Sequence, residues 1–466
     1  MELSTDQQTA LDKVTAWFNN DAVKRREPFI LTGGAGTGKS TIVSAILDAL
    51  PLKKTDILML APTGTAVKNV QLKTPGYPAQ TISSFIEKPF TVIEVIDNKT
   101  NERVDVLRNK RDVSRFDIDL GQEQAFNPDD YAYMTALSQT LARNNMRAEA
   151  NVGFKYRDDI DTAFKLLIID EWGMVSEDKS QVLRRLGVPF LALGDPYQLK
   201  PVGAVQNSLI VDRSRTDFYH ELTTTHRQAG DNPILQIATS ARNNKNWRKT
   251  ASHVKGEHVG ILSSIASSNA KLANLIARSD VVLSASNASV RAYNKLGHDK
   301  VYDNKTLLGA GEKILFTMNT TTKDSSGAPL FTNGTLGTIG EVKEIYDNYG
   351  LAKVTVIVDD VTTEVIVNTL NLTDSRVSRS NLNNSRGGRI QRTLAKRAFV
   401  DIASFGTDVD EIVFIAYGYA MTVHKSQGKE WPNVVFDTDV PAQMRSNEAS
   451  LIYTGITRAK ENIIFI

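Results

Sequence analysis

The amino-acid sequence predicts an α/β protein built on two parallel sheets, with two β-rich segments inserted into the chain. Short runs of apolar residues recur, as in strands of a parallel sheet that helices cover on both faces. In the first half of the chain these runs span 29–32, 57–61, 166–169 and 190–193. A glycine-rich loop joins the first run to a helical pattern over 39–50, which is the strand, turn and helix order of an α/β unit.

A second, discontinuous α/β set follows. Asn232 and Pro233 are predicted to open a helix, as its N-cap and its first residue. A strand over 281–283 precedes a helix that we expect to stop at Gly297. After a long interruption the pattern resumes with apolar runs over 413–415, 434–436 and 463–465.

Two segments lack this alternation of strand and helix. Within 86–159, the stretches 90–95 and 103–107 alternate in polarity around a turn sequence, which predicts a β-hairpin. Residues 306–411 are rich in Val, Ile, Thr and Gly and predict a small β domain. The expected domains are a first α/β domain over 1–85 and 160–207 with insert 86–159, and a second over 208–305 and 412–466 with insert 306–411.

The composition excludes several classes of protein. With 41% hydrophobic and 23% charged residues, the 466-residue chain is typical of a globular protein of several domains. The absence of cysteine excludes disulfides, thiolate catalysis, Cys-type zinc sites and iron–sulfur clusters. The polar N-terminus and the lack of a long apolar run predict neither a signal peptide nor a membrane span, so a cytoplasmic protein is expected, in the host cytoplasm if it is phage-encoded.

The sequence GGAGTGKS at 33–40 is a complete phosphate-binding loop between a strand and a helix. Its glycines let backbone amides converge on phosphate oxygens, and the helix N-terminus adds positive potential. Lys39 can reach the β and γ phosphates, and the Ser40 hydroxyl can bind Mg²⁺. The alternative is a plain glycine-rich turn with a surface lysine. The predicted loop contacts are Gly33, Gly34, Ala35, Gly36, Thr37, Gly38, Lys39, Ser40 and Thr41.

Acidic and amide side chains follow two other predicted strands. Asp170 and Glu171 end the run 166–169, where Asp170 can hold Mg²⁺ through water and Glu171 can polarise an attacking water. Gln198 follows the run 190–193 and can sense the terminal phosphate. The alternatives are an ordinary acidic strand end and a common Gly-Asp-Pro turn. With the phosphate loop present, the sequence predicts a nucleotide site that uses ATP and Mg²⁺.

These and further motifs resemble those of superfamily 1 helicases. GGAGTGKST, IIDEWGM and GDPYQLKPV resemble motifs I, II and III, and LAPTGTAVKNV resembles motif Ia. TVHKSQGKEW resembles motif V of the RecD/Pif branch, superfamily 1B, and YTGITRAKE resembles motif VI. The resemblance spans Gln7 to Arg458 and is strongest to Dda-like phage helicases. It implies two tandem RecA-like domains, a pin hairpin in the first insert and an SH3-like fold in the second.

The resemblance also implies roles for individual residues. Arg227 and Arg458 are expected to contact the γ-phosphate from the second domain, which neutralises charge on the transferring group. Gln7 is expected to read adenine, and Glu430 to lie in the nucleotide site. Gln7 has an alternative reading, because Ser4 and Gln7 also form the pattern of a helix capping box.

Nucleic-acid contacts follow from the resemblance and from charge. Residues 375–398 carry six Arg and one Lys without an acid, although the net charge of the chain is only +2. We expect this run to face DNA, with a solvated loop as the alternative. For single Ser and Thr residues a helix cap is the alternative, and for the hairpin aromatic a local core. The predicted DNA contacts are Pro62, Thr63, Thr65, Thr81, Ser83, Pro89, Phe90, Asn287, Arg386, Arg389, Arg392, Thr422, His424, Lys425 and Ser426.

The implied function is an ATP-dependent DNA helicase that moves 5′→3′ on single-stranded DNA, in phage DNA replication or recombination. The implied partners are single-stranded DNA, single-strand/duplex junctions and a single-strand-binding, replisome or recombination protein, with the motor active as a monomer. Two alternatives stay open: an RNA helicase of the same superfamily, and a nucleotide-dependent DNA-binding ATPase that does not separate strands. A GTPase switch is disfavoured because the sequence lacks a guanine-reading Asn/Thr-Lys-x-Asp element.

Overall fold

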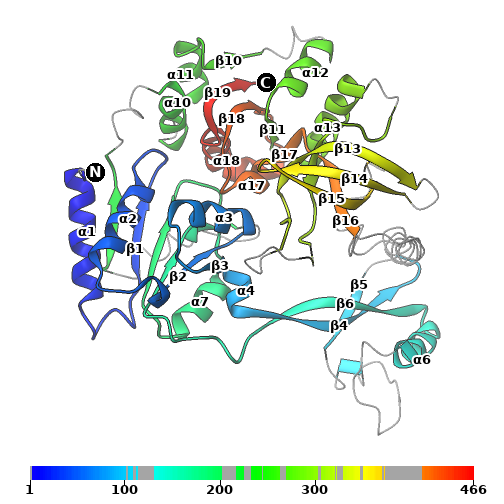
Figure 1. Cartoon of the computed structure of the whole chain (residues 1–466), viewed down its shortest axis with the longest axis horizontal. Coiled ribbons are helices and arrows are strands. Elements are labelled where there is room, and N and C mark those ends of the chain that lie inside the picture. Colours follow the sequence, from blue (N-terminus) through cyan, green and yellow to red (C-terminus); the bar gives the residue numbers. More distant parts are fainter. Residues whose placement is uncertain are drawn as a thin grey trace.

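The computed structural model describes most of the chain and shows two parallel sheets, a closed barrel and a three-stranded sheet (Figure 1). The described residues are 3–100, 103–108, 112–113, 131–201, 217–224, 232–243, 245–262, 269–302, 306–320, 322, 329–346, 350–369, 372 and 412–466.

The first sheet has six parallel strands in the order β3-β2-β7-β8-β1-β9. Its four central strands confirm the predicted apolar runs, and every residue of these four is buried. The sequence prediction missed the two edge strands, which are short and only partly buried. The strands are β1 (Phe29–Gly33), β2 (Ile57–Ala61), β3 (Ala79–Thr81), β7 (Leu166–Ile169), β8 (Phe190–Gly194) and β9 (Tyr219–Leu222).

Helices cover both faces of this sheet. One core packs side chains of α1, α2 and α3 on the strands, and a second core on the other face packs α4 and α7. The helical elements are α1 (Thr5–Phe18), α2 (Lys39–Ala49), η1 (Lys54–Asp56), α3 (Gly64–Lys73), α4 (Ile82–Ile86), η2 (Trp172–Met174) and α7 (Glu177–Arg185).

The second sheet has five parallel strands in the order β10-β19-β18-β11-β17. The strands are β10 (Val259–Ile261), β11 (Val281–Ser284), β17 (Ala420–Thr422), β18 (Trp431–Phe436) and β19 (Ala459–Phe465). The helical elements are α10 (Pro233–Arg242), α11 (Trp247–His253), α12 (Asn269–Arg278), α13 (Asn287–Tyr302), α17 (Val423–Ser426), η4 (Ala442–Asn447) and α18 (Glu448–Ile456).

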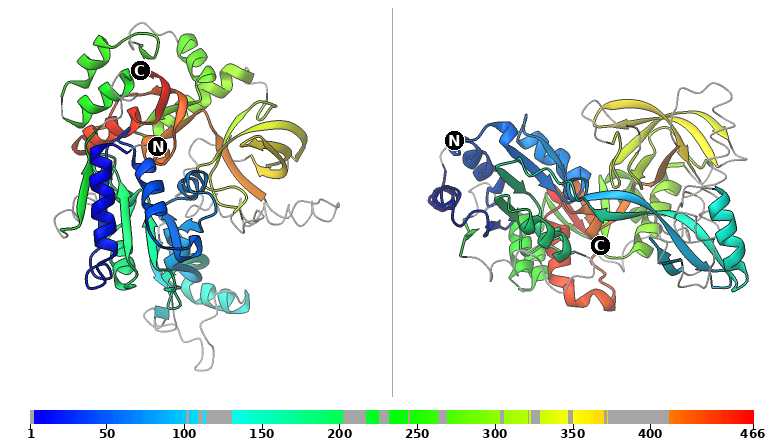
Figure 2. Two further views of the ribbon diagram at one scale, coloured as in Figure 1. Left: turned by 60° about the vertical axis from the view of Figure 1, so that its left-hand side comes forward. Right: turned by 90° about the horizontal axis from the view of Figure 1, so that it is seen from below.

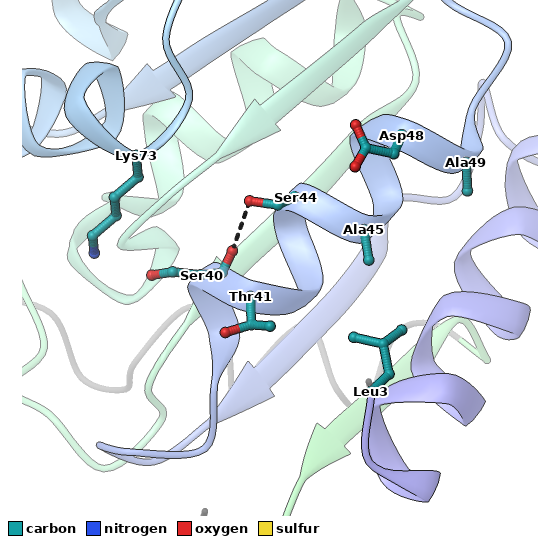
Figure 3. A pocket seen from close by; sticks show the side chains of 8 residues that line it. All are labelled: Leu3, Ser40, Thr41, Ser44, Ala45, Asp48, Ala49 and Lys73. Atoms are coloured by element: carbon teal, nitrogen blue, oxygen red, sulfur yellow. Dashed lines mark hydrogen bonds between the residues drawn. The ribbon is translucent and has the colours of Figure 1, made fainter. Parts of the chain in front are cut away.

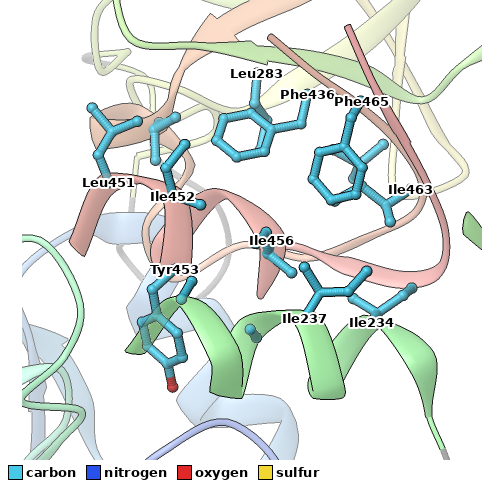
Figure 4. Close-up of a cluster of buried hydrophobic side chains, with 14 of the residues drawn as sticks. Ile234, Ile237, Leu283, Phe436, Leu451, Ile452, Tyr453, Ile456, Ile463 and Phe465 are labelled. Atoms are coloured by element: carbon cyan, nitrogen blue, oxygen red, sulfur yellow. The ribbon is translucent and has the colours of Figure 1, made fainter. Parts of the chain in front are cut away.

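The start of α10 and the core beneath it follow from the sequence. The Asn232 side chain accepts hydrogen bonds from the amides of Ile234 and Leu235, which confirms the predicted N-cap. Figure 4 shows Ile234 and Ile237 of this helix packed against side chains of α18, β11, β18 and β19. The apolar stripe of α10 thus faces the core of the second sheet.

Two sequence predictions for this part are wrong. Helix α13 continues past Gly297 to Tyr302. Gly297 lies buried in the helix because the Tyr419 ring packs against it, where a Cβ would come within 2.6 Å. The strand over 413–415 forms as part of β16 (Ile412–Tyr417), but it pairs in the barrel with β12 and β15 and not in the second sheet.

The second insert is a closed five-stranded barrel, consistent with the expected SH3-like fold. It stands beside the second sheet in each view (Figure 1, Figure 2). Only two residues, Gly418 and Tyr419, separate its last strand from β17. Lys313 of β12 also donates hydrogen bonds to the carbonyls of Ala277 and Ser279 at the end of α12. The strands are β12 (Lys313–Phe316), β13 (Leu336–Tyr346), β14 (Leu351–Val358), β15 (Val361–Asn368) and β16.

The first insert is a three-stranded antiparallel sheet with α6 (Tyr131–Ala142) near its far end (Figure 1). The predicted hairpin is confirmed as β4 (Glu87–Asp97) and β5 (Arg103–Leu107). The sequence prediction missed β6 (Met146–Tyr156), which pairs with β4 along its whole length. Across the part of the chain that the structure describes, no helix combines the length and the apolar character that a membrane span requires.

Candidate functional site

The loop between β1 and α2 is curled tightly around the Lys39 side chain. The Lys39 ammonium donates to the carbonyl oxygens of Gly33 at 2.6 Å and Gly34 at 3.0 Å. Gly36 and Gly38 adopt positive φ angles of 76° and 78°, which favour glycine. The predicted glycines are therefore needed for the loop to close on its own lysine.

The helix that follows this loop begins without a side-chain cap. Its N-cap is Gly38, which has no side chain to accept hydrogen bonds from the first turn. Uncapped amides at a helix N-terminus, together with the helix dipole, attract an anion. A buried strand, a glycine loop and an uncapped helix start thus form an anion site at the carboxyl edge of the first sheet.

A pocket borders this site along one side of α2 (Figure 3). Ser40 and Thr41 lie at its end nearest the loop, and Leu3 and Lys73 line it from the N-terminal segment and α3. Ser40 is exposed, so its hydroxyl is accessible to a cation beside a bound anion. The remaining lining residues are Ser44, Ala45, Asp48 and Ala49.

The acidic pair Asp170 and Glu171 lies at the carboxyl end of β7. The Asp170 carboxylate accepts a hydrogen bond from the Glu171 amide at 2.9 Å. Glu171 has a φ of 51°, a strained conformation for a residue with a side chain. Burial, together with the Asp170 charge, raises the pKa of Glu171 to about 7, although Arg458 and Lys39 act in the opposite direction. The fold thus holds a destabilised carboxylate beside the anion site.

We expect Glu171→Gln to raise the thermal stability of the metal-free protein, more at pH 8 than at pH 5. The folded-state pKa of Glu171, about 7, lies above the unfolded value of 4.5, so the protonated form is stabilised in the folded state. As the pH rises toward 8, the Glu171 carboxyl must lose its proton in the folded protein, and that stability is lost. Glutamine cannot ionise, so the variant does not lose stability in this way. Thermal unfolding with a chelator at both pH values measures the gain, with Glu177→Gln as an exposed control. An equal gain at both pH values would contradict the assignment.

Gln198 and its neighbours connect the two sheets. Gln198 is buried, and its Oε1 has no hydrogen-bond partner among the residues that the structure describes. The backbone amide of Leu199 donates to the Thr454 hydroxyl at 3.0 Å, and its carbonyl accepts from Gln427 at 2.9 Å. The predicted sensing segment of the first sheet is thus bonded to α18 and to the end of α17 in the second.

Tyr453, which the sequence analysis did not single out, reaches the phosphate loop from the second sheet. Its hydroxyl accepts a hydrogen bond from the Ala35 amide at 2.9 Å and donates one to buried Asp195 at 2.6 Å. Figure 4 shows its ring at the edge of the core with the hydroxyl pointing away from it. Burial and the Asp195 charge raise the pKa of Tyr453, which keeps the hydroxyl protonated as a donor. Its position at the start of YTGITRAKE is the sequence signal for it.

Tyr453→Phe is expected to destabilise the nucleotide-free protein by about 1–3 kcal/mol, because it removes the partner of the Ala35 amide and leaves the Asp195 carboxylate with the Tyr197 amide as its remaining donor. Chemical denaturation without nucleotide measures the change. Tyr346→Phe is a matched control, since its hydroxyl donates at 2.8 Å to Glu344 on the exposed surface of the barrel. Equal stability of the Tyr453 variant and the wild type would show that the contact carries no energy.

The structure describes one of the two predicted arginines. Arg458 is buried, and its guanidinium donates to the Thr454 carbonyl at 3.0 Å, the Lys429 carbonyl at 3.1 Å and the Thr457 hydroxyl at 2.9 Å. All these partners belong to the second sheet, although the Arg458 charge also lowers the pKa of Glu171 across the interface. Arg227 lies outside the described residues.

Gln7 forms the predicted helix cap and also contacts the phosphate loop. It forms the capping box with Ser4, through bonds of 3.0 and 3.2 Å. Its side-chain amide also donates to the Gly38 carbonyl in the phosphate loop at 3.4 Å, and the residue is buried. The cap is confirmed, while adenine recognition stays a prediction. Glu430 is exposed and lies 3.8 Å from the Lys460 ammonium.

Variants at positions 4 and 7 separate these two roles. Removing either half of the cap is expected to lower stability by about 1 kcal/mol. Only Gln7→Ala is expected also to raise the ATP KM and to reduce the preference for ATP over GTP, because Ser4→Ala leaves the Gln7 amide in place. Steady-state hydrolysis with both nucleotides measures this. If both variants change nucleotide selectivity to the same extent, adenine recognition by Gln7 is wrong.

Several predicted nucleic-acid contacts are local structural caps. Thr63, Thr81 and Thr422 each cap a helix with the side-chain oxygen, and Ser426 bonds to the Val423 carbonyl. These hydroxyls therefore stabilise the backbone, and a contact with nucleic acid stays a prediction. Thr65 Oγ1 is buried without a partner among the described residues, Asn287 and Lys425 are exposed, and burial lowers the pKa of His424.

Two of these predicted residues lie around one hollow. Pro62 and Ser83 line it together with Lys179, whose ammonium donates to Ser83 at 2.5 Å and to Glu87 at 2.9 Å. The sequence analysis missed Lys179, because no motif covers α7. This hollow combines a cation and a hydroxyl with the apolar side chains of Ile82, Met174 and Val175.

The predicted wedge residues lie where the β4–β6 pair leaves the first sheet. Phe90 is half-buried, with the Lys155 ammonium 5.8 Å from the centre of its ring. Pro89 pairs in register with Phe154, which is 66% exposed. The structure thus shows an exposed aromatic ring that the sequence analysis did not name. Arg386, Arg389 and Arg392 lie outside the described residues.

The residues present fit Mg²⁺ as an ion shared with phosphate. Among the described residues no group of three or more His, Asp or Glu side chains could hold a metal ion alone. Mg²⁺ is commonly held by one or two protein oxygens plus phosphates and water. The exposed Ser40 hydroxyl and the Asp170 carboxylate, both at the carboxyl edge of the first sheet, provide such oxygens.

Comparisons with known proteins match both halves of this site. A family model described as an AAA domain matches residues 2–259, and one described as a UvrD-like helicase C-terminal domain matches residues 417–466. The AAA domain covers more than half of the chain, including the phosphate loop and the acidic pair. The second model covers Tyr453 and Arg458.

Two curated relatives and one solved structure show the same likeness. The chain is 27% identical over 233 residues to the ATP-dependent DNA helicase dda of enterobacteria phage T4, covering 48% of this chain and 40% of that protein. It is 22% identical over 250 residues to the DNA replication ATP-dependent helicase/nuclease DNA2 of Saccharomyces cerevisiae, covering 49% and 14%. The matches thus span less than half of either relative. A structure of two coordinating Pif1 helicases at forked double-stranded DNA shares the fold, with 17% identity, 100% and 92% coverage and a TM-score of 0.50.

Proposed function

The chain belongs to the AAA-domain family and carries a UvrD-like helicase C-terminal domain. On that premise we propose that it is a superfamily 1B, Pif1-like helicase, an ATP-driven motor that moves 5′→3′ along single-stranded DNA and unwinds duplexes. Its likeness to the phage T4 helicase supports a role in phage DNA replication or recombination. The proposed substrates are single-stranded DNA and single-strand/duplex junctions, with ATP and Mg²⁺ in the cleft and the motor acting as a monomer.

One observation carries the proposal. The phosphate loop of the first sheet is hydrogen-bonded to α18 of the second sheet through Ala35 and Tyr453, 418 positions apart in sequence. A phosphate that binds the loop must compete for the Ala35 amide, and so it changes a contact between the two sheets. An enzyme that only bound or cleaved a nucleotide would not need this coupling.

The reaction assigns roles to residues at this interface. Lys39, now bound to loop carbonyls, is free to exchange them for the β and γ phosphates. Glu171 orients the attacking water and takes its proton, and Gln198 contacts the terminal phosphate. Arg227 and Arg458 neutralise the developing charge from the second sheet. Bound Mg²⁺, held by Ser40 and Asp170, would supply further charge neutralisation.

Hydrolysis then becomes a step along DNA. Loss of the terminal phosphate removes the contacts that draw the two sheets together, and the cleft reopens. We propose that Thr63, Thr65, Asn287, His424 and Lys425 hold the DNA backbone on alternate sides of this cleft, in line with sequence-independent binding. We further propose that Pro89 and Phe90 separate the strands, and that the arginines of 375–398 face DNA.

The domain boundaries are part of the proposal. Residues 1–85 and 160–207 form the first motor domain, with 86–159 as its pin insert. Residues 208–305 and the C-terminal segment form the second. Since β16 is a barrel strand, we place the end of the barrel insert at Tyr417 rather than before Ile412.

A tailed-duplex assay tests the function. Unwinding is expected with ATP on a DNA duplex that has a 5′ single-stranded tail, and not on a 3′-tailed duplex or on RNA. Lys39→Ala and Glu171→Gln should each reduce turnover by at least about 100-fold. Unwinding of only 3′-tailed or only RNA substrates would overturn the polarity or the substrate, and ATP hydrolysis without unwinding of any substrate would favour a DNA-binding ATPase. Unchanged turnover in Lys39→Ala would reject the nucleotide site.

A further inference from the structure

Arg242 is the last residue of α10, the helix that packs on the second sheet. It lies against the phosphate loop of the first sheet. A Cβ on Gly34 would come within 2.5 Å of Arg242 Nη1 and 3.7 Å of its Cζ. The guanidinium therefore packs directly on Gly34, and a side chain at this position would displace it. Gly34 is also the residue whose carbonyl accepts a hydrogen bond from Lys39.

The Arg242 side chain stacks on an aromatic ring and forms no ion pair with the residues that the structure describes. Its guanidinium carbon lies 4.8 Å from the centre of the Tyr197 ring. Tyr197 directly precedes Gln198 in the sequence. The Tyr197 hydroxyl donates to Glu221 at 2.9 Å and so is directed elsewhere. A guanidinium that stacks on an aromatic face keeps its N–H donors in the ring plane, free to bind an anion.

One donor of the Arg242 guanidinium is buried without a partner among the described residues. Its Nε is buried and has no hydrogen-bond partner in the part of the chain that the structure describes. The nearby Asp195 carboxylate is occupied by the Tyr453 hydroxyl and the Tyr197 amide. A buried charged donor without a partner lowers the stability of the folded protein, and proteins retain one mainly where a ligand supplies the acceptor. We infer that the acceptor for Arg242 is an anion bound at the phosphate loop.

We propose that Arg242 binds the terminal phosphate of the nucleoside triphosphate, as a positive group that the second sheet contributes beside Arg458. This inference rests on the proposed nucleotide site. Lys39 is expected to reach the β and γ phosphates, and its present contact with Gly34 places this end of the loop at the outer phosphates. Arg242 approaches Gly34 from the opposing sheet, and a planar guanidinium can bind two phosphate oxygens at once. Arg242 thereby distinguishes a triphosphate from a diphosphate.

Nucleotide affinities test this assignment. Displacement of a fluorescent nucleotide gives the Kd of ADP and of a non-hydrolysable ATP analogue for the wild type, Arg242→Gln and Arg242→Lys. For Arg242→Gln we expect the analogue to bind about tenfold or more weakly, because a charge-assisted bond is lost, with the ADP Kd within about twofold of the wild-type value. Arg242→Lys should lie between the two.

Arg248→Gln is the matched control, since Arg248 is exposed and stacks on the Trp247 ring at 4.6 Å away from the loop. It should leave both affinities unchanged. Equal weakening of ADP and the analogue by Arg242→Gln, or no weakening of either, would overturn the assignment, and thermal unfolding of each variant identifies a loss caused by misfolding. If the wild type binds neither nucleotide, the proposed function itself fails, which distinguishes that outcome from failure of Arg242 alone.

Discussion

The hydrogen bonds between the two parallel sheets are the interaction on which the arrangement depends. The segment from Asp195 to Leu199 leaves the first sheet, yet Leu199 lies in the hydrophobic core of the second. Its backbone groups bond to Thr454 and Gln427, and Asp195 bonds to Tyr453. Because these groups are buried, water does not compensate for their loss, and breaking them costs more than breaking surface contacts. The segment proposed to sense the nucleotide therefore also fixes the interface.

Several unfavourable conformations and charges lie in the same region. Glu171 combines a positive φ with a raised pKa, Gln198 has a buried oxygen without a partner in the described chain, and Arg242 has an unpaired buried donor. Around them lie fully buried strands and two apolar cores on the first sheet. Such costs persist where surrounding structure fixes them, and they cluster where a ligand or a reaction uses them. Their coincidence at one edge of the sheet supports a site built for a polyanionic ligand.

Local sequence patterns predicted the parts of this fold whose cause is local. The four central strands of the first sheet, the phosphate loop and the Asn232 cap depend on neighbouring residues, and each was predicted in place. The edge strands, β6 and the course of α13 through Gly297 depend on partners far along the chain. In the candidate site, too, local motifs predicted some residues, namely Lys39, Asp170 and Arg458. Tyr453 and Arg242 acquire their contacts only when α18 and α10 meet the phosphate loop.

The attachment of the barrel has a mechanical consequence. Two residues join β16 to β17, and a Cβ on Gly418 would collide with the Ile314 backbone at 2.7 Å. Lys313 bonds the neighbouring strand, β12, to the end of α12. Because this connection is short and closely packed, it has no room to act as a hinge. The barrel must therefore rotate with the second sheet as one rigid body. A small rotation at the interface between the two sheets would then displace the far end of the barrel by a larger distance, because displacement grows with distance from the axis of rotation.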